Sequence, residues 1–166
     1  MPVLTVLTYP DARLKEVAKP VDSCDGALRT LVHDLETTMR ASPGGVGIAA
    51  PQVGVLLRAV IVDVSIKKNI AHHGRMVLIN PEILLWEDMA VGREGCMSVP
   101  DYTGNVMRAQ RIKVQAYNEF GHATQYECVG YEARAVQHEL DHLDGMLFID
   151  RLVSRRHDLF ARVKKN

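Results

Sequence analysis

The residues best suited to do chemistry form the run HELDH at residues 138–142, in which His138 and His142 enclose Glu139. On a helix, positions four apart differ by about 40° of rotation and about 6 Å of rise, so both imidazoles can reach one metal ion. Glu139 can then face a water on that ion without becoming a ligand. The run predicts a zinc-type metallohydrolase, and a solvated polar stretch of helix is the less favoured interpretation.

Two histidines need a third ligand from elsewhere in the chain. Upstream, Cys96 follows a glycine and precedes Pro100, where a bend could aim its sulfur inward. We expect Cys96 to be this ligand, whereas Cys24 and Cys128 are interpreted as small buried hydrophobes. Other candidates for the third ligand lie downstream of the run and are less well placed: Asp144, Asp150, His157 and Asp158.

The composition is that of a globular protein without a charge bias. The chain has 166 residues, 47% of them hydrophobic, with 20 basic and 20 acidic side chains. This length suits one compact domain over residues 1–166, and the balanced charge gives no reason to expect DNA or a membrane as partner. The odd number of cysteines leaves a free thiol, and the N-terminus resembles neither a secretory signal nor a transit peptide. We therefore expect a cytoplasmic protein.

The apolar spacing predicts the elements that position these residues. An extended arm over residues 1–24 precedes a helix over 27–40 with Asp25 as its N-cap. Strands are expected at 56–64, 76–79, 83–86, 112–117 and 122–129. A helix over 131–144 ends at Gly145, and another amphipathic helix is expected over about 154–164. This order predicts an α+β fold, with small antiparallel sheets around a central metal-binding helix and helices near both ends.

Three segments resemble the signature motifs of peptide deformylases. They are GVGIAAPQ at 45–52, EGCMS at 94–98 and QHELDH at 137–142, in the family's order and at similar spacing. The family usually has leucine where this chain has Met97, a residue of similar volume. The resemblance implies removal of the formyl group from the N-terminal formylmethionine of nascent polypeptides, with release of formate.

The resemblance also implies roles for single residues. Cys96, His138 and His142 would bind one divalent ion, and the family points to Fe²⁺, although Zn²⁺, Co²⁺ and Ni²⁺ suit the same donors. Glu139 would transfer the proton, with Gln52 and the backbone N–H of Met97 at the oxyanion.

The same resemblance predicts where the peptide substrate binds. Gly45 and Gly47 would let an extended peptide approach the loop backbone. The candidates for the methionine pocket are Val46, Met97, Tyr131, Arg134 and Ala135.

Other polar residues are interpreted as structural. His72 and His73 are expected in a solvated loop without a third ligand nearby. Arg108 and Arg111 are expected on a solvated surface, with the steering of a peptide as the less favoured alternative. The basic side chains of the C-terminal helix are expected in solvent, although transient contact with the ribosome is an alternative. Two other functions remain open: an endopeptidase using the same histidines, and a binding module whose metal has four protein ligands.

Overall fold

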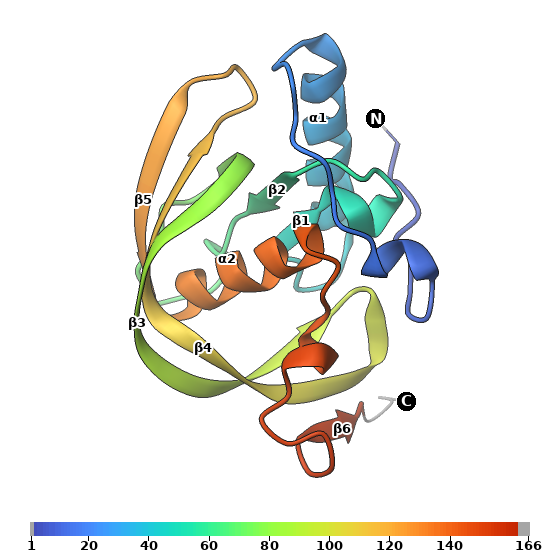
Figure 1. Cartoon of the computed structure of the whole chain (residues 1–166), viewed down its shortest axis with the longest axis vertical. Coiled ribbons are helices and arrows are strands. Elements are labelled where there is room, and N and C mark those ends of the chain that lie inside the picture. Colours follow the sequence, from blue (N-terminus) through green and yellow to red (C-terminus); the bar gives the residue numbers. More distant parts are fainter. Residues whose placement is uncertain (1, 163–166) are drawn as a thin grey trace.

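The computed structural model describes residues 2–162, in which a strongly curved sheet wraps around a central helix (Figure 1). The helices are α1 (Gly26–Ala41) and α2 (Gly130–Leu143), with 3₁₀ turns at Ala12–Lys15, Ala50–Val53 and Phe148–Arg151. The strands are β1 (Gly47–Ala49), β2 (Ala59–Val62), β3 (Met76–Cys96), β4 (Val99–Tyr117), β5 (Ala123–Val129) and β6 (Leu159–Ala161). The predicted α+β class is confirmed.

All described strand pairs are antiparallel, and they form one sheet in the order β1-β2-β3-β4-β5 with β6 beside β4. The long β3–β4 hairpin curves around α2 (Figure 1). At its closed end Cys96 pairs with Val99, which places the predicted third ligand at a tight turn. The small sheets expected from the sequence are therefore parts of one continuous sheet.

Strand β2 is apolar along its whole length because both of its faces are covered. Val60 and Val62 belong to the core around α2, whereas Ala59 and Ile61 belong to the core around α1. Successive strand residues point to opposite faces, so a strand between two helices must be apolar at every position. The α1 side adds Leu35 to this second core.

The two helices follow their local signals. The side chain of Asp25 accepts a hydrogen bond from the Leu28 N–H and caps α1. Helix α2 ends with Asp144 as C-cap, and Gly145 follows with φ of 72°. That left-handed conformation favours glycine, so the predicted end of this helix is confirmed.

The N-terminal arm connects two loops that approach the candidate metal ligands. It is extended except for one 3₁₀ turn, as expected. The Leu7 N–H donates to the Gln52 carbonyl and the Tyr9 N–H to the Ser98 carbonyl, each at 2.7 Å. These two hydrogen bonds hold the glycine-rich loop and the β3–β4 turn next to each other.

Two predictions about secondary structure are wrong. The strands expected at 76–79 and 83–86 are one strand, because β3 passes Asn80-Pro81 with irregular register instead of ending there. The helix expected over 154–164 is absent from its described part: residues 154–162 form a turn followed by β6, which pairs with β4. Pairing with an available strand edge overrides the local helical spacing, and residues 163–166 lie outside the described part.

No helix within residues 2–162 has the length and apolar character that crossing a membrane requires.

Candidate active site

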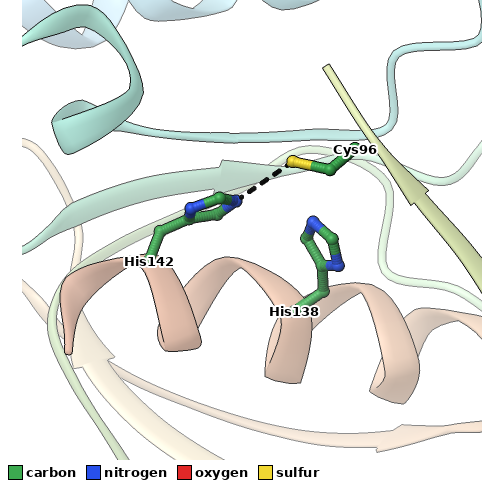
Figure 2. Close-up of side chains that lie close together, drawn as sticks. All are labelled: Cys96, His138 and His142. Carbon is green, nitrogen blue, oxygen red and sulfur yellow. Dashed lines mark hydrogen bonds between the residues drawn. The ribbon is translucent and has the colours of Figure 1, made fainter. Parts of the chain in front are cut away.

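Three candidate metal ligands converge on one side of α2. His138 and His142 project from successive turns of the helix, and Cys96 approaches from the end of β3 (Figure 2). Their ligand atoms all lie within 4.8 Å of one another, and the Cys96 sulfur is 3.4 Å from Nε2 of His142. Donors on one tetrahedral ion lie roughly 3.3–3.7 Å apart, given bonds of about 2.0–2.3 Å. One ion can therefore contact all three.

The electrostatics around these donors favour a cation. Burial lowers the pKa of His142 well below its usual value, which keeps this imidazole neutral and able to bind a metal. Burial opposes charge on His138 as well, but the neighbouring Cys96 sulfur and Glu94 carboxylate raise its pKa well above the usual range. The site thus favours one positive charge beside the sulfur, and a metal ion would supply that charge.

Glu94 orients His138. Nδ1 of His138 lies 2.9 Å from Glu94 Oε1, and a carboxylate can only accept, so the imidazole donates and its Nε2 remains for the metal. Arg108 and Arg134 also donate to Glu94 at 2.8–3.0 Å. Burial alone would raise the pKa of Glu94, but its hydrogen bonds with His138 and Arg108 outweigh burial and hold that pKa well below its usual value.

The expectation that Arg108 is solvated is wrong. It is 4% exposed, and besides Glu94 it donates to Asp141 at 2.6 Å. Ion pairing with Glu94 and Asp141 raises its pKa despite burial, so it stays charged. Arg111, on the same strand, is exposed and lies 3.9 Å from Glu87. For Arg111 the predicted solvated position is therefore correct.

Sequence reasoning assigned no role to Glu94, although two signals point to it. A metal-binding histidine usually donates its second ring nitrogen to a carboxylate or carbonyl. Glu94 also lies two residues before Cys96, and alternate residues of a strand share one face. Ser98 is a second residue without an assigned role, and its hydroxyl accepts from Gln52 Nε2 at 3.1 Å.

Glu139 lies between α2 and the glycine-rich loop. A Cβ at position 47 would be only 2.6 Å from Glu139 Oε2, so the glycine makes room for this carboxylate. Its Oε1 is buried and has no hydrogen-bond partner in the described part of the chain. Burial raises the pKa of Glu139 to about 7, a value suited to proton transfer near neutral pH.

Gln52 directs its amide group toward the metal ligands. Its Oε1 accepts from the Ala49 N–H at 2.9 Å, and this bond fixes the orientation of the amide. Nε2 consequently faces the β3–β4 turn, where it lies 3.6 Å from the Cys96 sulfur. The side chain is buried, so few other orientations are open to it.

A cavity of about 500 Å³ opens beside these groups. The remaining residues predicted to contact substrate all line it, and they are Gly45, Val46, Gly47, Met97, Tyr131, Arg134 and Ala135. Gln52, Cys96, His138 and Glu139 line it too, while His142 lies deeper with 1% of its surface exposed. The structure therefore brings every predicted site residue to one place.

Packing inside the protein also requires glycine at positions 45 and 47, besides any approach of a peptide. A Cβ on Gly45 would lie 2.2 Å from the Met39 carbonyl oxygen at the end of α1. Gly47, as described above, makes room for Glu139. Strand β1 is also the edge of the sheet among the described strands.

Comparison with known proteins identifies the family. The chain matches the family model of polypeptide deformylases over residues 3–158. A peptide deformylase of Alkalilimnicola ehrlichii is 46% identical over 155 residues, which are 92% of this chain and 83% of that protein. This chain belongs to the polypeptide deformylase family.

Further relatives and solved structures agree with this membership. A peptide deformylase of Bartonella tribocorum is 41% identical, covering 98% of this chain and 91% of its own length. The crystal structure of a peptide deformylase from Legionella pneumophila has a TM-score of 0.85 at 38% identity, over 93% of this chain and 89% of that one. A structure from Ehrlichia chaffeensis in complex with actinonin has a TM-score of 0.86 at 36% identity, over 94% and 92% of the two chains.

Membership decides among the functions that the sequence left open. The family is metal-dependent and hydrolyses the formyl amide of N-formylmethionyl nascent chains. The chain is accordingly a hydrolase of that class, and the endopeptidase and four-ligand binding module are not supported.

The contact between Gly47 and Glu139 generates a first prediction. Gly47→Ala should displace the carboxylate, and a misplacement of about 1 Å can cost about 10²-fold in turnover. Folding and metal content should persist, which elemental analysis and the thermal midpoint would show. Gly26→Ala is the control, because Gly26 begins α1 without a left-handed φ and a Cβ there meets only the end of the Arg29 side chain at 3.9 Å. Equal turnover of the two variants would contradict this role of Gly47.

The buried ion pairs generate a second prediction. Arg108→Met leaves Glu94 and Asp141 with one arginine fewer each, and breaking a buried pair typically costs about 3–5 kcal/mol. Arg134 and Arg151 still contact these carboxylates, so we expect the lower part of that range in urea unfolding. Arg111→Met, an exposed control on the same strand, should change stability by less than about 0.5 kcal/mol. A loss below 1 kcal/mol in Arg108→Met would exclude the network as a major source of stability.

Proposed function

We propose that this chain deformylates nascent polypeptides with Cys96, His138 and His142 as ligands of one divalent ion and with Glu139 as the proton carrier. The observation that carries this proposal is the position of Glu139. Its unpartnered, buried carboxylate oxygen lies beside the three converging donors, at a cavity that extends to the edge strand.

The ion that we propose is Fe²⁺. Two imidazoles and one thiolate also suit Zn²⁺, Co²⁺ and Ni²⁺, so these donors alone do not identify the ion. The family resemblance favours iron. When bound, the ion supplies Lewis acidity that makes a water nucleophilic near neutral pH.

Glu139 carries out both proton transfers in this proposal. Its carboxylate takes a proton from the attacking water and then delivers it to the amine nitrogen as the bond to the formyl carbon breaks. A carboxyl group that titrates near pH 7 can accept and release a proton with little loss in either direction. Gly47 keeps this carboxylate close to the cavity because no side chain stands between them.

Gln52 and Met97 stabilise the oxyanion in the proposed mechanism. The Gln52 amide is already oriented by Ala49 and Ser98, so its Nε2 donor needs little reorganisation when charge develops. Met97 follows Cys96 in the β3–β4 turn and lines the cavity, and its backbone N–H serves as the second donor.

The nascent peptide pairs with the outer edge of β1. The Val46 carbonyl accepts from Asp63 on the β2 side, whereas the Ala49 N–H bonds Gln52 on the other side. Backbone groups alternate along a strand, so those of Gly47 face outward, where an extended peptide can add as a strand. We expect the scissile end of such a peptide beside Glu139, because the Glu139 carboxylate lies against Gly47.

The methionine side chain occupies the part of the cavity lined by Tyr131 and Ala135. Arg134 lines the same wall, but its guanidinium is bound to Glu94 and to the carbonyls of Val106 and Ala90. It therefore presents its alkyl chain rather than a free charge, which suits an apolar substrate side chain.

The wider context of the reaction follows from the substrate. We place this catalytic domain, residues 1–166, in the cytoplasm, where formylated chains emerge from ribosomes. Transient ribosome contact would use the basic side chains of Arg155 and Arg156, which are exposed in a turn.

The direct test is hydrolysis of formyl-Met-Ala-Ser by iron-loaded protein kept free of oxygen. We expect release of formate, and much slower turnover of the N-acetyl analogue, whose extra methyl group must crowd the metal side of the cavity. Cleavage of internal peptide bonds only, or equal turnover of both substrates, would overturn the proposal.

Replacing Glu139 by Gln separates catalysis from structure. The amide keeps the size but removes the proton acceptor, and general acid–base catalysis contributes about 10²–10⁴-fold. We expect turnover to fall by that factor, or roughly 3–5 kcal/mol of transition-state stabilisation, with iron content and thermal midpoint preserved. Turnover within tenfold of the parent would remove Glu139 from the mechanism, and loss of iron would make it a ligand.

Replacing Cys96 by Ala tests the ligand set. Bound iron, measured by elemental analysis after anaerobic loading without zinc, should fall from about one ion per chain to a small fraction. Cys24→Ala is the control, since Cys24 is a free, half-buried thiol whose sulfur lies near the Asn118 carbonyl instead. Full iron content in Cys96→Ala would show that the thiolate is not a ligand.

A further inference from the structure

A second group of metal-binding side chains lies at the other end of α2. His73 comes from the loop before β3, Cys128 from the end of β5 and Glu132 from the first turn of α2. One ligand atom from each lies within 4.8 Å of the other two. His73 is exposed, as predicted, but the prediction that no further ligands lie nearby is wrong, because the loop folds back onto the helix.

Glu132 is a buried carboxylate with few compensating charges. It is 1% exposed and accepts from the His73 backbone N–H at 2.7 Å, while Nδ1 of His73 lies 2.5 Å from its other oxygen. His73 is the one basic side chain that forms an ion pair with it in residues 2–162. The buried carboxylate Glu94 has two arginines by comparison. A buried charge with so little compensation is costly, and a nearby cation would offset that cost.

Cys128 supplies a sulfur donor to the same place. It is fully buried, and burial together with Glu132 raises the pKa of its thiol well above the usual value. The thiol therefore remains protonated beside the carboxylate unless a cation replaces its proton. Metal binding and thiol deprotonation are linked in this way at structural zinc sites.

The three donors have the composition of a zinc site. Imidazole nitrogen, thiolate sulfur and carboxylate oxygen all bind Zn²⁺ at about 2.0–2.3 Å, with tetrahedral donors roughly 3.3–3.7 Å apart. The His73–Glu132 distance of 2.5 Å is shorter. Binding must move these atoms apart by about 1 Å. His73 can make this movement because its side chain is 37% exposed and belongs to a loop.

We propose that His73, Cys128 and Glu132 form a second metal site, selective for Zn²⁺ and separate from the active site. Glu132 precedes His138 by six residues, which is about 9 Å along the helix. The exposed side of His73 gives the ion an entry path and a position for a water as fourth ligand. A bound ion would tie the loop and β5 to the start of α2, the helix that carries the catalytic histidines.

Zinc stoichiometry in the full chain tests the proposal. Equilibrium dialysis against Zn²⁺ followed by elemental analysis should find about two ions per chain in the parent and about one in Cys96→Ala. Cys96→Ala combined with His73→Ala should bind almost none, whereas Cys96→Ala combined with Cys24→Ala should keep one. His73 is exposed, so its replacement should leave the fold intact.

The absorption spectrum of bound Co²⁺ tests whether the Cys128 sulfur is a ligand of the second site. In the Cys96→Ala background Co²⁺ should produce thiolate-to-metal absorption in the near ultraviolet, and adding Cys128→Ala should remove it. Zn²⁺ should also raise the thermal midpoint of Cys96→Ala, but not of the variant that also lacks His73.

A Cys96→Ala protein that binds no zinc, or binds it equally without His73 and Cys128, would overturn the proposal. The three side chains would then form only a histidine–carboxylate hydrogen bond beside a buried thiol. Failure of formyl-peptide hydrolysis would not bear on this result.

Discussion

The buried carboxylate of Glu94 is the point on which the geometry of the active site depends. It receives hydrogen bonds from His138, Arg108 and Arg134, which come from three different positions on β4 and α2. The arginines make a buried negative charge tolerable, and that charge in turn fixes the ring of His138. Since Glu94 and Cys96 share one face of β3, the strand positions one candidate metal ligand together with the residue that orients another.

Helix α2 serves several purposes because the sheet encloses it. Its apolar residues Ala133, Val136 and Leu140 pack in the main core, while its histidines face the β3–β4 turn. Close packing leaves little space around these histidines, which explains the glycine at position 47 beside Glu139. The first turn of the same helix carries Glu132, so both candidate metal sites depend on its position.

Local signals in the sequence predicted local structure well. The cap at Asp25, the helix end at Gly145 and the spacing of His138 and His142 all depend on neighbours within a few residues. Predictions failed where a distant segment decides the outcome. The segment 154–162 has helical spacing, yet part of it pairs with the edge of β4. Arg108 was predicted to be a surface residue because its partners Glu94 and Asp141 are distant in the sequence.

Residue types and their spacing were enough to predict the chemistry of this protein. Side-chain type and helical periodicity predict that two imidazoles reach one metal ion and that the Glu139 carboxylate lies beside the ion without binding it. Three motifs in order are specific enough to indicate the family. Which charges compensate one another, by contrast, depends on the folded arrangement of the chain. The meeting of Glu94 with Arg108, and of His73 with Cys128 and Glu132, depends on how the sheet curves around α2. That curvature is set by packing and strand register across the whole chain, which no short stretch of sequence encodes.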